Sequence, residues 1–565
     1  MALILLFALI DFAAILAITI IHRPWMNYAF THFSYYIILA LTLTWALCLV
    51  NLAVEKKANL TLFFRTYWRG IAFSLALATL VFVSVPKYFR VLSDETNLLS
   101  VAKSMTYERQ VRNITEGRWY YEMFWPTASS TEKRPFLFPF FTSLMHTFFG
   151  YRVANVFALN YVVLSITLFL LYLLIRFYLG ELLAFASLIL VVAQPVFSLS
   201  ATSGSYELFN LLFILASLIS LRFFLRNPNS QAFVVLVFNL VMLANVRYES
   251  GLFLLVTALV LCFSGYMRSS FFKPSLVLVP FLLLPLIWQR IIMLNEPDPN
   301  FSGSWLSALK FHYAWKNTVL FFKYILDCSG HWGYAGIVNA AGLLAVVYFL
   351  VFLLIGPQGL NKRQEKPVLL MTSVISIFVL FGIAIIYQGG INDHPMQGRL
   401  YLPILIVLSV LPIFFFAQIV KDHHKLSIPV FIGALIIFIY YHPMAVEDRL
   451  TNNLMIIREF RYVDDFLKKN ADKNSLIICG RPGQIEVYNY GAISYTTANQ
   501  EASTLLRQYK NHLFSSIYVI QSISYQTNSP LQDNIVDSRY SLETVSELQM
   551  LGSYYFRISW VRPPQ

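Results

Sequence analysis

The sequence predicts a polytopic α-helical membrane protein with a small extracytoplasmic α/β domain at its C-terminal end. Of its 565 residues, 58% are hydrophobic and only 13% are charged, about half the usual share of charged residues in soluble domains. The charged residues lie in short clusters between apolar runs that are long enough to cross a bilayer. These observations exclude a soluble, a disordered and a fibrous protein.

The net charge and the cysteines say little about partners. A formal charge of +13 in a soluble domain would suggest nucleic acid, but in a membrane protein it fits basic cytoplasmic loops together with a site for an anionic substrate. We therefore expect no nucleic-acid partner. The four cysteines are far apart and form no redox or metal motif: Cys48, Cys262, Cys328 and Cys479.

Apolar windows of about 17 to 25 residues predict about thirteen transmembrane helices. The first run, Ala2 to Ile21, has no basic start and no small-residue cleavage site, so we expect a retained helix and not a signal peptide. The spans are expected to begin near Leu3, Tyr35, Ile71, Val153, Leu182, Tyr206, Ala232, Gly251, Ser275, Ala335, Val368, Leu400 and Ile428.

Basic residues in alternate short connections predict the orientation, because cytoplasmic loops are enriched in Lys and Arg. The side that carries them is expected to be cytoplasmic, which places the N-terminus inside and, after an odd number of spans, the C-terminal segment outside. The extracytoplasmic segments are then 90–152, 295–334 and 447–565. The basic residues in question are Lys56, Lys57, Arg65, Arg69, Arg222, Arg226, Arg268, Lys273, Lys362, Arg363, Lys366, Lys421 and Lys425.

The segment from Glu447 to Gln565 differs from the rest in composition, because polar helical stretches alternate with short strand-like ones. We expect helices over 450–469 and 501–512 and strands over 475–479 and 516–522. The turn from Gly480 to Gly483 lacks the glycine spacing and the Lys-Ser/Thr ending of a phosphate loop, so we interpret it as a plain strand-to-strand turn.

The first outer segment, 90–152, begins with an amphipathic helix. Ser93 is a candidate N-cap, and Leu98, Leu99, Ala102 and Met105 follow at helical spacing. Asp94 and Glu95 have two interpretations. Acids in a first helical turn favourably meet the helix dipole without any chemistry, or one of them faces a cavity at the membrane surface as a general base. Adjacent residues on a helix point about 100° apart, so at most one faces the cavity, and we favour Asp94.

Two basic sites also have two interpretations each. Lys133 and Arg134 either extend toward lipid headgroups or bind the phosphate of a lipid-linked substrate. Arg247 lies between two short apolar runs, where an ionisable group is either functional or paired with Glu249.

We expect no metal site. Asp298, Asp327 and His331 carry suitable ligand atoms, but their spacing matches no metal motif. We expect no cofactor either.

Several of these features together resemble a known family. They are the Asp94-Glu95 pair after a span, the Glu-Lys-Arg-Pro segment 132–135 before apolar and aromatic residues, the Phe-Gly pair 149–150, and Arg152 at the start of the next span. Ser-Tyr-Glu at 205–207 and Gln-Gly-Arg-Leu-Tyr-Leu-Pro at 397–403 agree with them. The pattern is similar to that of type C glycosyltransferases, in particular the lipid A aminoarabinose transferase and the protein O-mannosyltransferases.

The resemblance implies a polyprenyl-phosphate sugar donor, an acceptor hydroxyl on the outer face and inversion at the sugar carbon. The family's base aspartate falls on Asp94 and its donor-binding lysine on Lys133. Arg134 replaces the first proline of the family's Glu-Lys-Pro-Pro segment, so the backbone is less constrained there. Arg399, at the outer end of a span, is the next candidate for stabilising the departing phosphate.

We therefore expect three parts: two extra N-terminal helices with a basic cytoplasmic loop in 1–70, a glycosyltransferase core in 71–446, and an extracytoplasmic α/β domain in 447–565. The expected function is glycosyl transfer to lipid A or lipopolysaccharide, another glycan or a protein, in a bacterial inner membrane with the site on the periplasmic face. The catalytic candidates are Asp94 and Glu95, and the donor-phosphate ligands are Lys133, Arg134, Arg247 and Arg399.

The alternatives are a transporter, a non-enzymatic membrane scaffold and an O-antigen ligase or polymerase. A transporter would carry its ionisable residues near the membrane midplane, whereas most of them here lie in outer loops. A scaffold would tolerate neutralising Asp94, Lys133 and Arg399 together. A ligase or polymerase would be expected to place its large outer loop late in the span order, not after the third span.

Overall fold

The computed structural model describes residues 23–295, 311–355, 365–387, 397–420, 423–451, 454–550 and 552–563. The chain divides into two compact units. We call Met1–Lys87, Lys133–Phe138 and Phe157–Arg449 the helical unit, and Tyr88–Glu132, Pro139–Val156 and Leu450–Gln565 the sheet unit.

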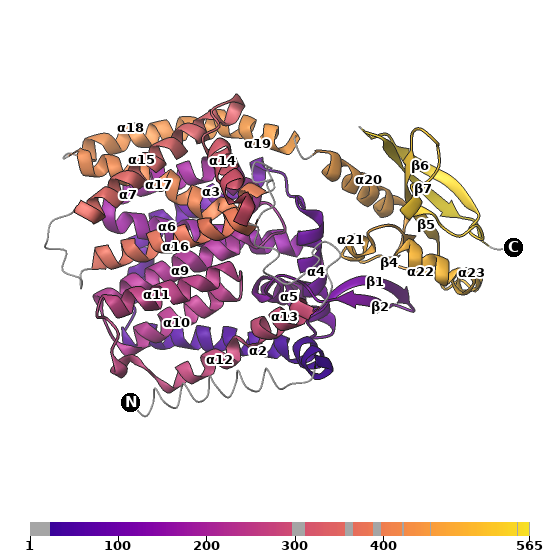
Figure 1. The fold of residues 1–565 in the computed structure, drawn as a ribbon, viewed down its shortest axis with the longest axis horizontal. Helices are drawn as coiled ribbons and strands as arrows, with labels where there is room; N and C mark the ends of the chain where they lie inside the picture. The colour runs from indigo at the N-terminus through magenta and orange to yellow at the C-terminus, as the bar shows by residue number, and fades with distance from the viewer. Residues whose placement is uncertain are drawn as a thin grey trace. The chain divides into compact units, whose positions relative to one another are not determined.

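The helical unit consists mainly of apolar helices of different lengths that follow one another along the chain (Figure 1). They are α2 (Arg23–Glu55), α3 (Leu60–Ser84), α6 (Ala154–Leu179), α7 (Glu181–Ala193), α8 (Pro195–Ala201), α9 (Glu207–Arg226), α10 (Ser230–Ala244), α11 (Leu252–Phe263), α12 (Val279–Leu282), α13 (Leu284–Asn295), α14 (Ala314–Ile325), α15 (Gly333–Ile355), α16 (Glu365–Tyr387), α17 (Leu402–Ile419), α18 (His423–Ile436) and α19 (His442–Thr451).

Within the described residues, nine helices are long and apolar enough to cross a membrane, and α7 with α8 forms a tenth if this pair, bent by 79°, is one span. Proline at the first position of α8 accounts for the bend, because it cannot continue the preceding helix. The chain is thus a polytopic helical membrane protein, as the composition predicts.

The expected spans correspond to these helices with three differences. The span expected near Leu182 is α7, a helix of 13 residues that reaches the length of a span only together with the bent α8. The spans expected from Ala232 and Gly251 are helices of only 15 and 12 residues, α10 and α11, which are shorter than a bilayer crossing at 1.5 Å per residue. The span expected near Leu3 lies outside the described residues.

The buried side chain of Asn239 joins the first described helix to the rest of the helical unit. The Trp45 indole N–H of α2 donates to Asn239 Oδ1 of α10 at 2.8 Å, and the Asn239 amide donates to Ser220 Oγ of α9 at 2.5 Å. Such bonds are favourable inside a membrane because no water is available there to satisfy polar groups. The helix α2 is therefore integrated into the helical unit.

The sheet unit contains seven strands in the order β2-β1-β4-β3-β5-β7-β6. The neighbours β4, β3 and β5 are parallel, and the other pairs are antiparallel. Its elements are α4 (Leu92–Tyr107), β1 (Asn113–Tyr120), β2 (Met123–Ser130), α5 (Leu137–Phe149), α20 (Leu454–Asn470), β3 (Leu476–Ile478), α21 (Pro482–Glu486), β4 (Gly491–Ile493), α22 (Tyr495–Gln500), α23 (Ala502–Lys510), β5 (Ile517–Ser524), β6 (Leu542–Leu548) and β7 (Tyr554–Val561).

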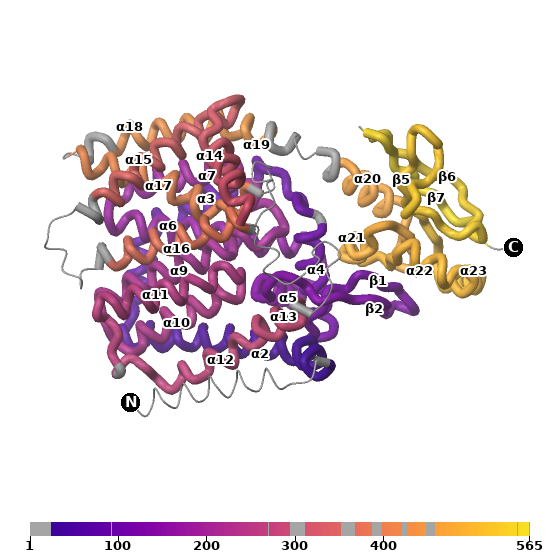
Figure 2. Tube along the Cα trace, in the orientation of Figure 1, coloured from indigo at the N-terminus to yellow at the C-terminus, as the bar shows by residue number. Residues whose placement is uncertain are grey.

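The hairpin of β1 and β2 comes from the first outer segment, whereas the other five strands come from the C-terminal segment. Gly117 of β1 pairs with Ala492 of β4 and so joins the two segments in one sheet. Figure 2 shows the indigo-to-purple hairpin beside the orange and yellow C-terminal elements. The sequence patterns do not predict this hairpin.

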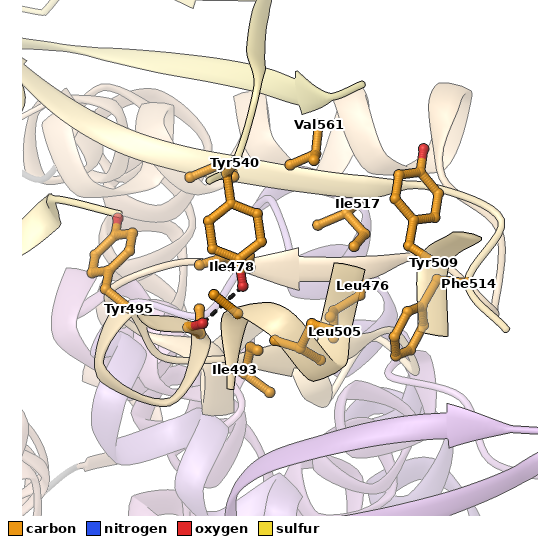
Figure 3. Packing of buried hydrophobic residues seen from close by; sticks show 13 residues of the cluster. Leu476, Ile478, Ile493, Tyr495, Leu505, Tyr509, Phe514, Ile517, Tyr540 and Val561 are labelled. Carbon is orange, nitrogen blue, oxygen red and sulfur yellow. Dashed lines mark hydrogen bonds between the residues drawn. The ribbon is translucent and has the colours of Figure 1, made fainter. Parts of the chain in front are cut away.

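Alternating side chains of the central strands build a hydrophobic core on each face of the sheet. Leu476 and Ile478 of β3 pack with α22 and α23 on one face, where the Tyr540 hydroxyl donates to the Ala498 carbonyl oxygen at 2.7 Å (Figure 3). Ile477 of β3 packs on the other face with Val463 and other residues of α20. The predicted α/β character of this segment is therefore confirmed.

Two local predictions in this unit are wrong. The segment after β3 is not a strand-to-strand turn, because Pro482 occupies the first turn of the helix α21, a position that proline favours. Ser93 does not cap α4, because that helix begins at Leu92 with Val91 as its N-cap. The expected apolar face of α4 is nevertheless correct, since Leu98, Leu99, Ala102 and Met105 are all buried.

Candidate functional site

Charged residues of the helical unit gather where several helices begin or end. Because α9 and α10 are joined by a short turn and pack against each other, the start of α9 lies beside the end of α10. This arrangement brings Tyr206 and Glu207, at the start of α9, near Arg247, which follows α10.

Glu207 connects two of the predicted phosphate ligands. Its carboxylate is 2% exposed and forms an ion pair with Arg399 at 3.4 Å. It also lies close enough to Arg247 to interact electrostatically. Arg247 in turn forms an ion pair with Glu249 at 3.4 Å and lies 5.6 Å from the Tyr206 ring centre.

Two further arginines belong to the same group. The Arg290 guanidinium, on α13, stacks over the Tyr248 ring at 3.6 Å and interacts electrostatically with Glu249. Arg134 acts electrostatically on Tyr206, and its carbonyl oxygen accepts a hydrogen bond from the Gln289 amide at 3.0 Å.

We call this set the arginine cluster: Arg134, Arg247, Arg290 and Arg399 with Glu207, Glu249, Tyr206 and Tyr248. Among the described residues that make up this cluster, four guanidinium groups accompany two carboxylates. Arginine suits bidentate contact with a phosphate. A group of arginines of this kind among apolar helices can therefore bind a phosphate whose lipid chain lies along the helices.

The structure thus brings together three of the predicted phosphate ligands, Arg134, Arg247 and Arg399. The fourth, Lys133, has an exposed side chain beside Arg134 in the sequence. Arg247 and Glu249 form the expected ion pair. Both residues belong to the arginine cluster, so this pairing is compatible with a role of Arg247 in binding phosphate.

Sequence reasoning did not single out Arg290 as a site residue. The sequence feature that could have identified it is that Arg290 is a lone arginine within an apolar run. Ionisable groups are costly there and are functional candidates by default. Glu207 entered only as part of a motif, and no local pattern connected it to Arg399, which lies 192 residues further along the chain.

The two catalytic candidates lie in the sheet unit, at the start of α4, and have different surroundings. The buried Glu95 carboxylate accepts hydrogen bonds through Oε1 from the backbone N–H groups of Arg90 at 3.2 Å and Val91 at 3.1 Å. These are N–H groups at the helix start, so Glu95 stabilises the start of α4. Asp94 is half-buried.

The described residues contain no group of three or more His, Cys, Asp or Glu side chains that could hold a metal ion. Asp327 accepts hydrogen bonds from the Ser329 backbone N–H at 2.9 Å and from the Trp332 indole N–H at 2.8 Å, so its carboxylate organises a local turn. Asp298 lies outside the described residues.

Residues 133–292 match the family model described as dolichyl-phosphate-mannose-protein mannosyltransferase. This segment includes Arg134, Glu207, Arg247, Glu249 and Arg290 of the arginine cluster. A search among curated proteins found no match.

Three solved structures are similar in overall arrangement at low sequence identity. ArnT from Cupriavidus metallidurans bound to undecaprenyl phosphate is 13% identical, covers 87% of this chain and 97% of its own, and has a TM-score of 0.49. Apo ArnT from the same organism is 12% identical, with coverages of 88% and 98% and a TM-score of 0.37. The oligosaccharyltransferase AglB from Archaeoglobus fulgidus, in complex with an inhibitory peptide and a dolichol-phosphate, is 12% identical, with coverages of 81% and 69% and a TM-score of 0.43. With TM-scores below 0.5, these likenesses carry no argument about the site.

The apolar helices define the class of protein, a polytopic helical membrane protein, and residues 133–292 are similar to a mannosyltransferase family. This partial match agrees with the resemblance to the protein O-mannosyltransferases in the sequence motifs.

Proposed function

We propose that this protein transfers a sugar from a polyprenyl-phosphate donor to a hydroxyl group of an extracytoplasmic acceptor, with inversion at the sugar carbon. The observation that carries this proposal is the arginine cluster, in which four arginines outnumber two carboxylates within a unit of apolar helices. A lipid-linked phosphate needs both features, a cationic site for its head and apolar helices for its chain.

In the proposed reaction, the acceptor oxygen attacks the anomeric carbon of the sugar. A bond forms between these two atoms while the bond from the anomeric carbon to the phosphate oxygen breaks. The acceptor proton passes to Asp94, and the polyprenyl phosphate leaves with the bonding electron pair. Lys133, Arg134, Arg247, Arg290 and Arg399 bind the phosphate and stabilise the negative charge that develops on it.

Asp94 is a better candidate for the general base than Glu95. A base must be able to accept a proton from a substrate, and the Glu95 carboxylate already accepts two hydrogen bonds from the start of its own helix. Asp94 lies in the first turn of the same helix and is half-buried, not fully buried. We assign the base to Asp94 and a structural role to Glu95.

We further propose that the protein resides in a bacterial inner membrane with its site on the periplasmic face. The basic residues in alternate short connections support this orientation. The acceptor is then a periplasmic glycan, a lipid such as lipid A, or a protein.

The test is transfer of a labelled sugar from a panel of polyprenyl-phosphate sugars in membranes that contain the wild type, Asp94→Asn or Asp465→Asn at equal abundance. Asp465 is an exposed acid on α20 and serves as the control. We expect Asp94→Asn to lower the rate about a hundredfold or more, as loss of a general base does, and Asp465→Asn to leave it unchanged.

Separation of the labelled products into lipid, glycan and protein fractions identifies the acceptor. Full activity of Asp94→Asn would refute the assignment of the base. An inactive wild type, folded and abundant with every donor of the panel, would refute the proposed function.

A further inference from the structure

The sheet unit contains a fully buried ion pair that the proposed reaction does not use. Lys103 of α4 and Glu486 of α21 have no exposed side-chain surface, and Lys103 Nζ lies 2.6 Å from Glu486 Oε1. The two residues are 383 positions apart in the sequence. Taking two charges out of water is costly, so a pair of this kind is weak evidence for stability, and a role in fixing one specific arrangement is an alternative to test.

The surroundings of Lys103 specify a single position for its ammonium group. It donates to the Glu486 carboxylate and also to the Glu486 carbonyl oxygen at 2.9 Å, and it lies 3.9 Å from the centre of the Phe124 ring. The third contact is a cation–π interaction with the β2 strand of the first outer segment. One side chain of α4 thereby contacts both the C-terminal segment and the hairpin.

Neighbouring hydrogen bonds also join the two segments, and the ring of Tyr151, which makes one of them, lies 5.4 Å from Lys103 Nζ. The Tyr151 hydroxyl donates to the Val487 carbonyl oxygen at 2.6 Å, and Glu116 Oε1 accepts from the Ser494 backbone N–H at 3.2 Å. These bonds hold other parts of the first outer segment to the C-terminal segment. Lys103 is the α4 side chain that forms an ion pair with the C-terminal segment within the described residues.

The position of Lys103 on α4 connects this contact to the proposed base. Asp94 lies nine residues earlier on the same helix, roughly 14 Å along its axis. A helix is stiff over this length, so a shift or rotation at Lys103 moves Asp94 as well. The helix is therefore the physical link between the C-terminal segment and the reacting atoms.

We propose that Lys103 and Glu486 are positioning residues, which hold α4 against the C-terminal segment and thereby place Asp94 for the transfer reaction. This inference rests on the proposed function, in which Asp94 is the general base. It gives the C-terminal segment a specific part in the reaction, because that segment supplies the partner of Lys103.

The test compares purified wild type with Lys103→Met, Glu486→Gln and the double variant Lys103→Met/Glu486→Met. Each single variant leaves one buried group without its partner, so we expect lower thermal stability. The double variant has neither charge of this pair left, so we expect it to melt near the wild-type temperature. We nevertheless expect its kcat to stay about tenfold below that of the wild type, with the donor KM unchanged. Two apolar side chains make no directional hydrogen bond, so they do not fix the orientation of α4 as the ion pair does.

Hydrogen exchange measures the docking of α4 without reference to activity. We expect faster exchange over residues 92–107 in the double variant and unchanged exchange in β5 and β7. Arg557→Met is the matched control, because it removes an ion pair with Glu547 between β6 and β7 at 2.8 Å, in the same sheet. It should keep the wild-type kcat and the wild-type exchange of α4.

The outcomes separate this inference from the proposed function. If the wild type transfers sugar and Asp94→Asn does not, a wild-type kcat in the double variant overturns the positioning role and leaves the proposed function standing. Unchanged exchange of residues 92–107 in the double variant overturns it as well. If the wild type transfers no sugar, the proposed function fails and the positioning role fails with it.

Discussion

Two adjacent carboxylates at the start of α4 differ in what surrounds them. The spacing of Asp94 and Glu95 made both residues candidates, and the helix geometry indicated that only one could face a cavity. The structure distinguishes them through the backbone, since Glu95 accepts hydrogen bonds from the N–H groups of Arg90 and Val91. A sequence pattern cannot choose between such neighbours, because the choice depends on how the chain enters the helix.

This difference predicts that Glu95 matters for stability. Glu95→Ala removes the acceptor of two backbone N–H groups and should cost about 1 to 2 kcal/mol of unfolding free energy, in the range of other lost helix caps. It also removes a negative charge beside Arg90, whose pKa burial lowers to about 10 against the opposing effect of Glu95.

Thermal unfolding of the purified protein measures this loss. Glu95→Gln keeps a carbonyl acceptor and should lose less stability than Glu95→Ala. Equal melting temperatures for wild type and Glu95→Ala would contradict the capping role.

Charged residues of the helical unit show a second limit of residue-by-residue reasoning. Arg247 and Arg399 were predicted as separate phosphate ligands, and each has an acidic partner in the structure. Their positive charge is therefore partly compensated, and the charge balance of the cluster depends also on Arg134 and Arg290. This balance is a property of the group and not of any one residue.

Among the elements, the helices α15 and α17 pack closely because one of them has no side chain at the contact. A Cβ atom added at Gly342 of α15 would overlap the backbone carbonyl oxygen of Leu408 on α17. A backbone atom cannot turn aside as a flexible side chain can. Helix pairs in membranes often approach closely at small residues of this kind.

We therefore expect Gly342→Ala to destabilise the helical unit by about 1 to 3 kcal/mol, the usual cost of inserting atoms into a packed site. Gly382→Ala on α16 is the control, because nothing lies within 4 Å of a Cβ added there. The melting temperature in detergent distinguishes the two variants. A melting temperature of Gly342→Ala equal to that of Gly382→Ala would show that α15 and α17 can separate at no cost.

The prediction of membrane spans from apolar runs was least accurate at the short helices α10 and α11. The sequence predicted two spans interrupted by Arg247, Tyr248 and Glu249, and the structure has two helices too short to cross a bilayer. Hydropathy measures how apolar a run is, but it does not show where a helix bends or ends around a charged group. Arg247, Tyr248 and Glu249 also belong to the arginine cluster, so the interruption between α10 and α11 supplies residues of the candidate site.

Across the whole molecule, the four cysteines provide a test of the proposed orientation. Cys262 and Cys328 are exposed, whereas Cys48 and Cys479 are buried. Cys262 precedes a basic connection and should be cytoplasmic, whereas Cys328 belongs to an outer segment. In intact cells with single-cysteine variants, a membrane-impermeant maleimide should label Cys328 and should label Cys262 only after permeabilisation.

A further single-cysteine variant, which keeps only Cys479, is the control for folding in this experiment. Burial raises the pKa of its thiol to about 12, so the reactive thiolate is scarce at neutral pH, and the atom is also inaccessible. It should react only after denaturation. Labelling of Cys262 in intact cells, with Cys479 still protected, would reverse the proposed orientation.

The sequence by itself determined the class of this protein, which is a polytopic helical membrane protein, the order of most of its helices and its resemblance to a mannosyltransferase family. These properties follow from the lengths of apolar runs, the places of basic residues and short motifs, all of which are local. It also named three of the four arginines of the cluster, because charges next to apolar runs stand out.

The tertiary structure alone decided which of these residues meet. The addition of the β1–β2 hairpin to the C-terminal sheet, the pairing of Glu207 with Arg399 and the burial of Lys103 against Glu486 join residues far apart in the chain. Local patterns do not contain such contacts, because they depend on how complete elements pack and on which buried charges must then be compensated.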